Sequence, residues 1–295
     1  MDDHRGVATG PPEELRTRVL SAWDALLALA DSAGRQDLAL LAELGSWPER
    51  PVLARLMAQA RSGLPGSDPG PERGPGRGPE GSPERAPEPP RQDHAGEDRE
   101  AVLAALAGAR QRVAAALDEV AEQPALALVE LDSALGPLPL LTQIHAMGHE
   151  LALAALRCSE GPAAVPVAIT DAGVAALVDV VGALAHRQGV RASAGVWGSG
   201  TSGWVFTADG DGWRTTPGSS GVPGIEGAAA TVLGVPAGRG ALPSLLAKGE
   251  IRLHRIGGLM ALAPLVEQVP GLPGGALLRR AVGVVGLLGR LPGIR

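Results

Sequence analysis

The chain has 295 residues, of which 45% are hydrophobic and only 2% aromatic, and its formal net charge is −6 at pH 7. The negative charge argues against nucleic-acid binding, which usually needs a basic surface, and the length predicts two domains with their own cores. A single cysteine, Cys158, excludes an internal disulfide bond and is typical of a reducing cytosol. Lys248 is the only lysine among 26 Lys and Arg residues, a bias typical of a GC-rich bacterial genome.

Neither end of the sequence has the pattern of a membrane-spanning segment. The amino-terminal residues MDDHRGVATGPPEEL are acidic and polar, unlike a signal peptide. The longest apolar stretch is interrupted by Arg279, Arg280 and Arg290, which make a membrane span costly. We therefore predict a soluble, cytoplasmic protein. The basic segment 274–295 fits two roles, a helix that covers the core or a peripheral contact with an anionic membrane surface.

The first predicted helix begins at Pro11-Pro12. Proline in the first turn, with Glu13 and Glu14 at the positive end of the helix dipole, is typical of a helix start. Apolar residues recur at helical spacing up to Ala30, which predicts one buried face. Further helical stretches follow at about 36–45 and about 49–61.

Residues 63–97 differ from the segments around them. Gly or Pro occupies roughly every second position, and there is no apolar periodicity. Such a segment buries too little apolar surface to offset the entropy of ordering it, so we predict a disordered insert. A solvated linker is the interpretation we favour over an interaction tail.

Helical periodicity returns at about 97–121. The segment LGPLPL (135–140) then breaks the chain and begins a helix that contains MGHELALAALRC (147–158). Several helices with short connections predict an antiparallel bundle over 1–62 and 98–160.

Residues 170–295 are predicted to form an α+β domain. We expect a helix at 171–187 with Asp171 as its N-cap, then strands in SAGVW, GWVFTA, GWRTT and AAATVLGV, with the ADGDG turn making 203–216 a hairpin. Helices are expected at about 239–248, 257–268 and 274–289, and a strand at about 250–255. The pattern favours an antiparallel sheet with helices on one face.

Two motifs suggest a function but have a simpler explanation. GSGTSG matches the glycine spacing of a phosphate loop through Gly198, Gly200 and Gly203, but a strand follows instead of a helix, so we predict a flexible strand connection. Cys158 lies at a helix end where the dipole does not favour a thiolate, so we predict a structural cysteine.

His145 and His149 are the most suggestive pair. Their i, i+4 spacing places both imidazoles on one helical face, as two metal ligands would be. No third ligand stands beside them in the sequence, and Glu150 points about 100° away from His149 around the helix. An ordinary helix with a few polar residues therefore remains the alternative.

Three segments together resemble a known family. SW..RPVLARLMAQA, REAVLAALAGARQRV and LGPLPLLTQIHAMGHELALAAL are similar to the mycothiol-dependent maleylpyruvate isomerases. The resemblance implies a mainly α protein with an N-terminal DinB-like four-helix bundle and a C-terminal α+β domain similar to sterol carrier proteins. It covers nearly the whole chain apart from 63–97.

The family resemblance also implies a divalent metal, typically zinc, held by one histidine and a Glu-x-x-x-His pair. In this sequence the first histidine falls on Arg55, the glutamate on Glu150 and the second histidine on Ala154. The acidic residue that often follows in the family falls on Arg157. A guanidinium cannot bind a metal, so the metal site is degenerate, Glu150 is a remnant ligand, and we expect an Arg55–carboxylate pair in its place.

These observations lead to three hypotheses about function. We predict a non-catalytic relative, with no catalytic or cofactor-binding residues, that binds a small hydrophobic ligand or a protein partner. The first alternative is an active isomerase or thiol transferase that uses zinc or another divalent metal with mycothiol, with His145 and His149 as replacement ligands. The second is an interaction protein that acts through the Pro-rich insert or the basic C-terminus.

Overall fold

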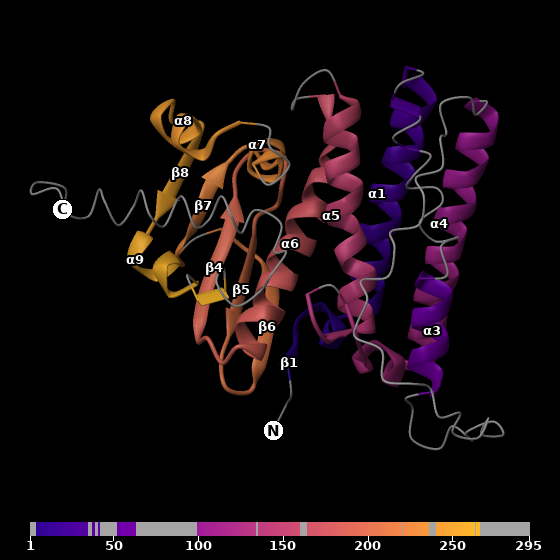
Figure 1. The fold of residues 1–295 in the computed structure, drawn as a ribbon, viewed down its shortest axis with the longest axis horizontal. Coiled ribbons are helices and arrows are strands. Elements are labelled where there is room, and N and C mark those ends of the chain that lie inside the picture. Colours follow the sequence, from indigo (N-terminus) through magenta and orange to yellow (C-terminus); the bar gives the residue numbers. More distant parts are fainter. Residues whose placement is uncertain are drawn as a thin grey trace, which may run out of the picture.

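The computed structural model describes residues 4–34, 37–38, 41, 52–62, 99–133, 135–159, 164–219, 221–235, 240–262 and 264–265, without the side chains of 52–56. Helices predominate in the first half and a sheet in the second (Figure 1). The predicted insert 63–97 and the predicted helix 274–289 lie outside these residues.

Among the described residues, the N-terminal helical region contains the helices α1 (Pro12–Ser32), α3 (Val52–Ser62), α4 (Arg99–Glu122) and α5 (Leu140–Cys158) (Figure 1). Short elements join them: the 3-10 helices η1 (Gly6–Thr9) and η2 (Pro124–Leu128), and the antiparallel pair β2 (Glu130–Leu131) and β3 (Leu138–Pro139). The predicted proline start of the first helix is confirmed. The predicted stretch at about 36–45 falls largely outside the described residues.

Five strands of the second half and β1 from the amino terminus form a six-stranded sheet among the described residues, in the order β1-β6-β5-β4-β7-β8. Its strands are β1 (His4–Arg5), β4 (Ala192–Trp197), β5 (Trp204–Ala208), β6 (Gly212–Pro217), β7 (Gly224–Gly227) and β8 (Ile251–His254). The helical elements of this half are α6 (Val167–Arg187), α7 (Ala229–Gly234), α8 (Leu242–Ala247), α9 (Ile256–Leu259) and η4 (Met260–Leu262).

The predicted hairpin at 203–216 is confirmed as β5 and β6, which pair antiparallel. The prediction of a purely antiparallel sheet is wrong, because β1 runs parallel to β6 and β4 runs parallel to β7. The predicted strand in AAATVLGV is also wrong. This segment forms helix α7 with its alanines buried, since small side chains let its short turns pack closely against α6 and α5.

Helix α6 is the central element, with the sheet on one side and α5 on the other (Figure 1). It is long and apolar enough to cross a membrane by length and composition, but 67% of its most apolar window is buried inside the protein, as in a core helix. Glycines allow its close contacts: a Cβ on Gly173 would lie 2.5 Å from the Cβ of Ala152 in α5, and a Cβ on Gly182 would lie 3.0 Å from the Cβ of Phe206 in β5. Small residues therefore set the distance between the helical region and the sheet.

The amino-terminal segment crosses from the helices to the sheet and adds β1 to its edge. Gly6 follows this strand with φ +56°, a left-handed conformation that favours glycine. A Cβ at Gly6 would lie 2.0 Å from Trp213 Nε1 and 2.1 Å from Asp179 Oδ1. The backbone must therefore pass without a side chain over two buried polar groups.

Replacing Gly6 by alanine tests this close passage. Gly189→Ala is the matched control, because Gly189 also has a positive φ of 66° but no atom lies within 4 Å of the position that a Cβ would take there. Both variants carry the left-handed penalty of about 1–2 kcal/mol, and we expect Gly6→Ala to lower the free energy of unfolding by at least about 2 kcal/mol more. Urea denaturation of both variants measures the difference, and equal values would contradict the packing described.

Candidate functional site

The predicted metal-site residues lie on α5, but the structure does not assemble them into a metal site. Glu150 is exposed on the helix surface, and no hydrogen bond or ion pair reaches it from any described residue. Its carboxyl group is nevertheless partly removed from water, which raises the pKa of Glu150, and Arg157 offsets this only in part. Ala154, which stands where the family resemblance implies a histidine, is a buried methyl group.

The expected Arg55–Glu150 pair stays a prediction. Arg55 belongs to α3, which lies beside α5, but its side chain is outside the described residues. Arg157, at the last turn of α5, is exposed. Because Ala154 supplies no ligand one turn after Glu150, the described residues do not fit a metal ion held by Glu150.

His145 makes a specific contact instead. Its imidazole is fully buried, and Nδ1 lies 3.5 Å from Oδ2 of Asp179, which is also fully buried on α6. The other nitrogen, Nε2, has no hydrogen-bond partner among the described residues. A carboxylate on one nitrogen of an imidazole orients the ring and makes the other nitrogen a better acceptor, although no solvent reaches it here.

Asp179 is the centre of a buried hydrogen-bond network. Its Oδ1 accepts from the backbone N–H of Val7 at 3.2 Å, from Trp213 Nε1 at 3.0 Å and from Thr215 Oγ1 at 2.7 Å. These donors come from the amino-terminal segment and from β6. Together with His145 on α5, they hold three segments of the chain around one carboxylate of α6.

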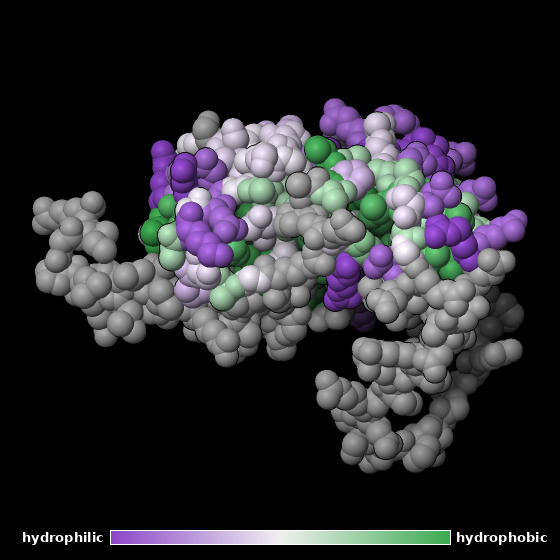
Figure 2. Space-filling model, turned by 90° about the horizontal axis from the view of Figure 1, so that it is seen from above, coloured by the Kyte–Doolittle hydropathy of each residue, from purple (hydrophilic) through white to green (hydrophobic). Residues whose placement is uncertain are grey.

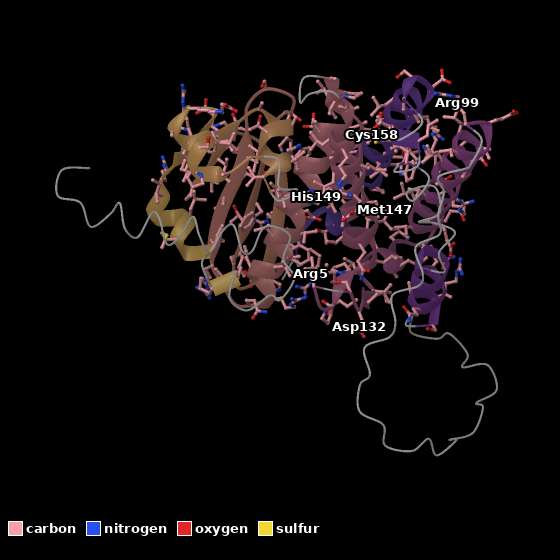
Figure 3. The ribbon with its side chains drawn as sticks, turned by 45° about the horizontal axis from the view of Figure 1, so that its top comes forward. Arg5, Arg99, Asp132, Met147, His149 and Cys158 are labelled. Carbon is pink, nitrogen blue, oxygen red and sulfur yellow. The ribbon has the colours of Figure 1, made fainter. Side chains whose placement is uncertain are left out.

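His149 lies where the helices meet the sheet region (Figure 3). It is 8% exposed and sits beside the backbone of Gly173, but neither ring nitrogen has a hydrogen-bond partner of good geometry in the described part of the chain. Burial lowers its pKa from 6.5 to about 4. The imidazole is therefore neutral at physiological pH.

His145, His149 and Thr142 share one face of α5, since their spacing is three and four residues. The hydroxyl of Thr142 is also buried and without a described partner. This face thus carries polar atoms in the interior, but it does not make a complete metal site. No group of three or more His, Cys, Asp or Glu residues in the described ranges is placed to hold a metal ion.

Asp171 has a different role from the predicted one. Helix α6 begins at Val167, so Asp171 lies inside it and is not its N-cap. Its Oδ1 accepts from Trp204 Nε1 at 3.0 Å, from Thr201 Oγ1 at 2.8 Å and from both the N–H and the hydroxyl of Ser202 at 2.7 Å. Burial raises its pKa, but these hydrogen bonds outweigh burial and the net pKa is lowered.

The other two motifs have structural roles. The GSGTSG segment connects β4 to β5 with positive φ at Gly198, Gly200 and Gly203, which confirms a strand connection. Cys158 is half-buried at the end of α5 (Figure 3), and its Sγ lies 3.5 Å from the carbonyl oxygen of Asp37.

Sequence reasoning missed the Asp179 network. Asp179 and His145 are 34 residues apart on two separate helices. One signal was available: an aspartate inside the otherwise apolar run GVAALVDVVGALA is a charge on a helix that must be buried.

Two solved structures are similar to this chain: the mycothiol-dependent maleylpyruvate isomerase and a mutant of it in which alanine replaces a histidine. Each is 15% identical and covers 80% of this chain and 93% of that chain, with TM-scores of 0.47 and 0.45 respectively. No protein-family model matches the chain, and no curated protein matches it.

The buried His149 predicts an acid-sensitive fold. Since its pKa is lowered in the folded state, the unfolded chain binds the proton more readily, so stability is present above about pH 6.5 and is lost as the pH falls towards 4. His149 alone is expected to lower the free energy of unfolding by about 2 kcal/mol between pH 7 and pH 5. In His149→Leu this loss is absent, so the free energy of unfolding should change less between pH 7 and pH 5.

Chemical denaturation at a series of pH values measures this effect. His254→Leu is the control for the loss of one histidine, because His254 is partly exposed and pairs with Glu226 at 2.7 Å on the sheet. If the wild type and His149→Leu lose the same stability between pH 7 and pH 5, the imidazole is not buried as described.

Proposed function

We propose that this chain is a maleylpyruvate isomerase-like protein that has lost the metal-dependent activity and acts by binding a small ligand. In this proposal the helical region is a DinB-like four-helix bundle and the sheet region a sterol-carrier-like domain. The observation that carries the proposal is the buried methyl group of Ala154 one turn after Glu150. A carboxylate alone on a helix face does not supply the three protein ligands of a catalytic zinc site.

The neighbouring residues support the loss of the metal. His145 directs one nitrogen at Asp179, and His149 faces α6 beside Gly173, so both imidazoles contribute to the contact between α5 and α6. Neither is directed to Glu150 by any described contact. These residues stabilise the arrangement of the two halves of the protein instead of completing a metal site.

One observation supports the active-enzyme alternative. His149 is neutral at physiological pH and both of its nitrogens lack described partners, as a metal ligand would require. The alternative of an interaction protein rests on 63–97 and on the basic C-terminus including 274–295. Most of these residues lie outside the described part of the chain, so the role stays a prediction.

The zinc content of the purified protein tests the proposal. We expect the wild type to hold far less than one zinc ion per chain by elemental analysis, and added zinc to leave the melting temperature unchanged, because Ala154 offers no ligand. Bound stoichiometric zinc in the wild type, lost in His149→Ala, would favour the active-enzyme alternative.

The double variant Arg55→His/Ala154→His is the matched positive control. It restores the ligand set that the family resemblance implies, with Glu150 and the histidine at 154 on one helix face. We expect this variant to gain zinc and to melt at a higher temperature in its presence. Glu150→Gln in the same background removes the gain if Glu150 is the remnant ligand.

A further inference from the structure

The turn between β5 and β6 contains two Asp-Gly pairs, Asp209-Gly210 and Asp211-Gly212. Strand β5 ends at Ala208 and β6 begins at Gly212, so the first pair lies wholly in the connection. Asp209, Gly210 and Asp211 are exposed, whereas Gly212 is buried. An Asp-Gly pair is reactive because glycine has no side chain that shields its backbone nitrogen from the preceding carboxyl group.

The carboxyl group of Asp209 is held against the backbone that follows it. Its Oδ1 accepts from the backbone N–H of Asp211 at 2.9 Å, as the side chain of an aspartate at the start of a turn commonly does. This hydrogen bond keeps the carboxyl group folded back over the intervening peptide of Gly210. Among the described residues, no acceptor binds the N–H of Gly210. The nitrogen next to the carboxyl group is therefore exposed and unpaired within the described part of the chain.

The Gly212 nitrogen of the second pair is in a different environment. Gly212 pairs with His4 of β1 and has a φ of +145°, and a Cβ there would lie 1.8 Å from the backbone oxygen of His4. The backbone of Gly212 cannot turn towards a neighbouring carboxyl group without breaking this pairing. Around Gly210, by contrast, the nearest group to the position of a Cβ is the end of the Arg191 side chain, at 3.2 Å.

The main chain of Asp209 connects the turn to α6 and β1. Its carbonyl oxygen lies 3.3 Å from Nδ1 of His186, at the end of α6. Arg5 of β1 lies 2.6 Å from the other nitrogen, Nε2. Because a guanidinium only donates, Nε2 is the acceptor and the neutral imidazole carries its proton on Nδ1, facing Asp209. A change in the Asp209 carbonyl group thus reaches the edge strand β1 through one imidazole.

We propose that Asp209 is a site of spontaneous isomerisation to isoaspartate. The backbone nitrogen of Gly210 attacks the side-chain carboxyl carbon of Asp209 and forms a new C–N bond. The nitrogen loses its proton and the carboxyl group loses a hydroxyl, so one water molecule leaves and a five-membered succinimide remains. Water then opens this ring. Opening at the main-chain carbonyl leaves Gly210 attached to the former side chain, which is isoaspartate, and opening at the other carbonyl restores aspartate.

The reaction needs no other reactant, because the first step releases one water molecule and the second consumes one. Isoaspartate lengthens the main chain of the turn by one carbon atom. It also converts the Asp209 carbonyl that faces His186 into a free carboxylate. This carboxylate is the group that protein isoaspartate methyltransferases methylate, so such an enzyme is a reagent for the modified protein. The site is independent of the proposed ligand-binding function.

Prolonged incubation of the full chain at neutral pH, in water enriched in the heavy oxygen isotope, tests the proposal. Trypsin then releases the peptide 192–214, which contains both Asp-Gly pairs, and electron-transfer fragmentation distinguishes isoaspartate from aspartate at each position. We expect isoaspartate and one heavy oxygen atom to accumulate at Asp209 at least about tenfold faster than at Asp211. A sample digested before the incubation corrects for isoaspartate formed during digestion.

Asp211→Glu is the matched control and should leave the rate at Asp209 unchanged. Asp209→Glu should stop the reaction at that position, because cyclisation would then need a six-membered ring. In denaturant, where the fold no longer separates the two pairs, both should react at similar rates. Equal or faster isomerisation at Asp211 in the folded protein, or no isoaspartate at Asp209 while the denatured chain forms it, would overturn the proposal. This comparison within the wild type decides the question even if Asp209→Glu does not fold.

Discussion

The buried carboxylate of Asp179 is the interaction on which the arrangement of the two halves depends. A charge without solvent is costly unless several donors surround it. Here the donors come from the amino-terminal segment and from β6, and an imidazole of α5 faces the second oxygen. A shift of any one of these elements would remove one or more of the contacts to this carboxylate.

The composition explains how the elements approach so closely around it. With 2% aromatic residues, the core is built mainly from Ala, Leu and Val, and glycines at the α5–α6 contact bring the backbones together. A Cβ on Gly148 would lie 3.0 Å from the carbonyl oxygen of Ala172. Charged residues are left to the outside, where ion pairs such as Arg110–Asp24 link α4 to α1. Figure 2 shows hydrophilic residues on the surface at both the helical end and the sheet end of the molecule.

Periodicity predicted the long elements, because α1 and α4 bury one face at helical spacing and α5 is buried over most of its circumference. The Asp-Gly turn fixes the β5–β6 hairpin. Periodicity failed where tertiary contacts determine the secondary structure or the role of a side chain. AAATVLGV is short and apolar, so its pattern cannot separate a strand from a buried helix. Asp171 resembles an N-cap, but its partners are some 30 residues away in sequence. The proposal that the metal site is degenerate rests on Arg55 and Ala154 in the sequence, whereas the contacts of His145 and His149 required the fold.

The parallel pairing of β1 with β6 has a consequence for the order of folding during synthesis. Val7 emerges from the ribosome first, but the carboxylate that it contacts follows 172 residues later. The early helices can form as they emerge, since their hydrogen bonds are local. Their final packing requires α6 and the sheet, which are synthesised later. Contacts between residues so far apart in sequence slow folding. A nascent chain that stalls before α6 therefore exposes apolar surface of α1 and α5, and exposed apolar surface favours aggregation.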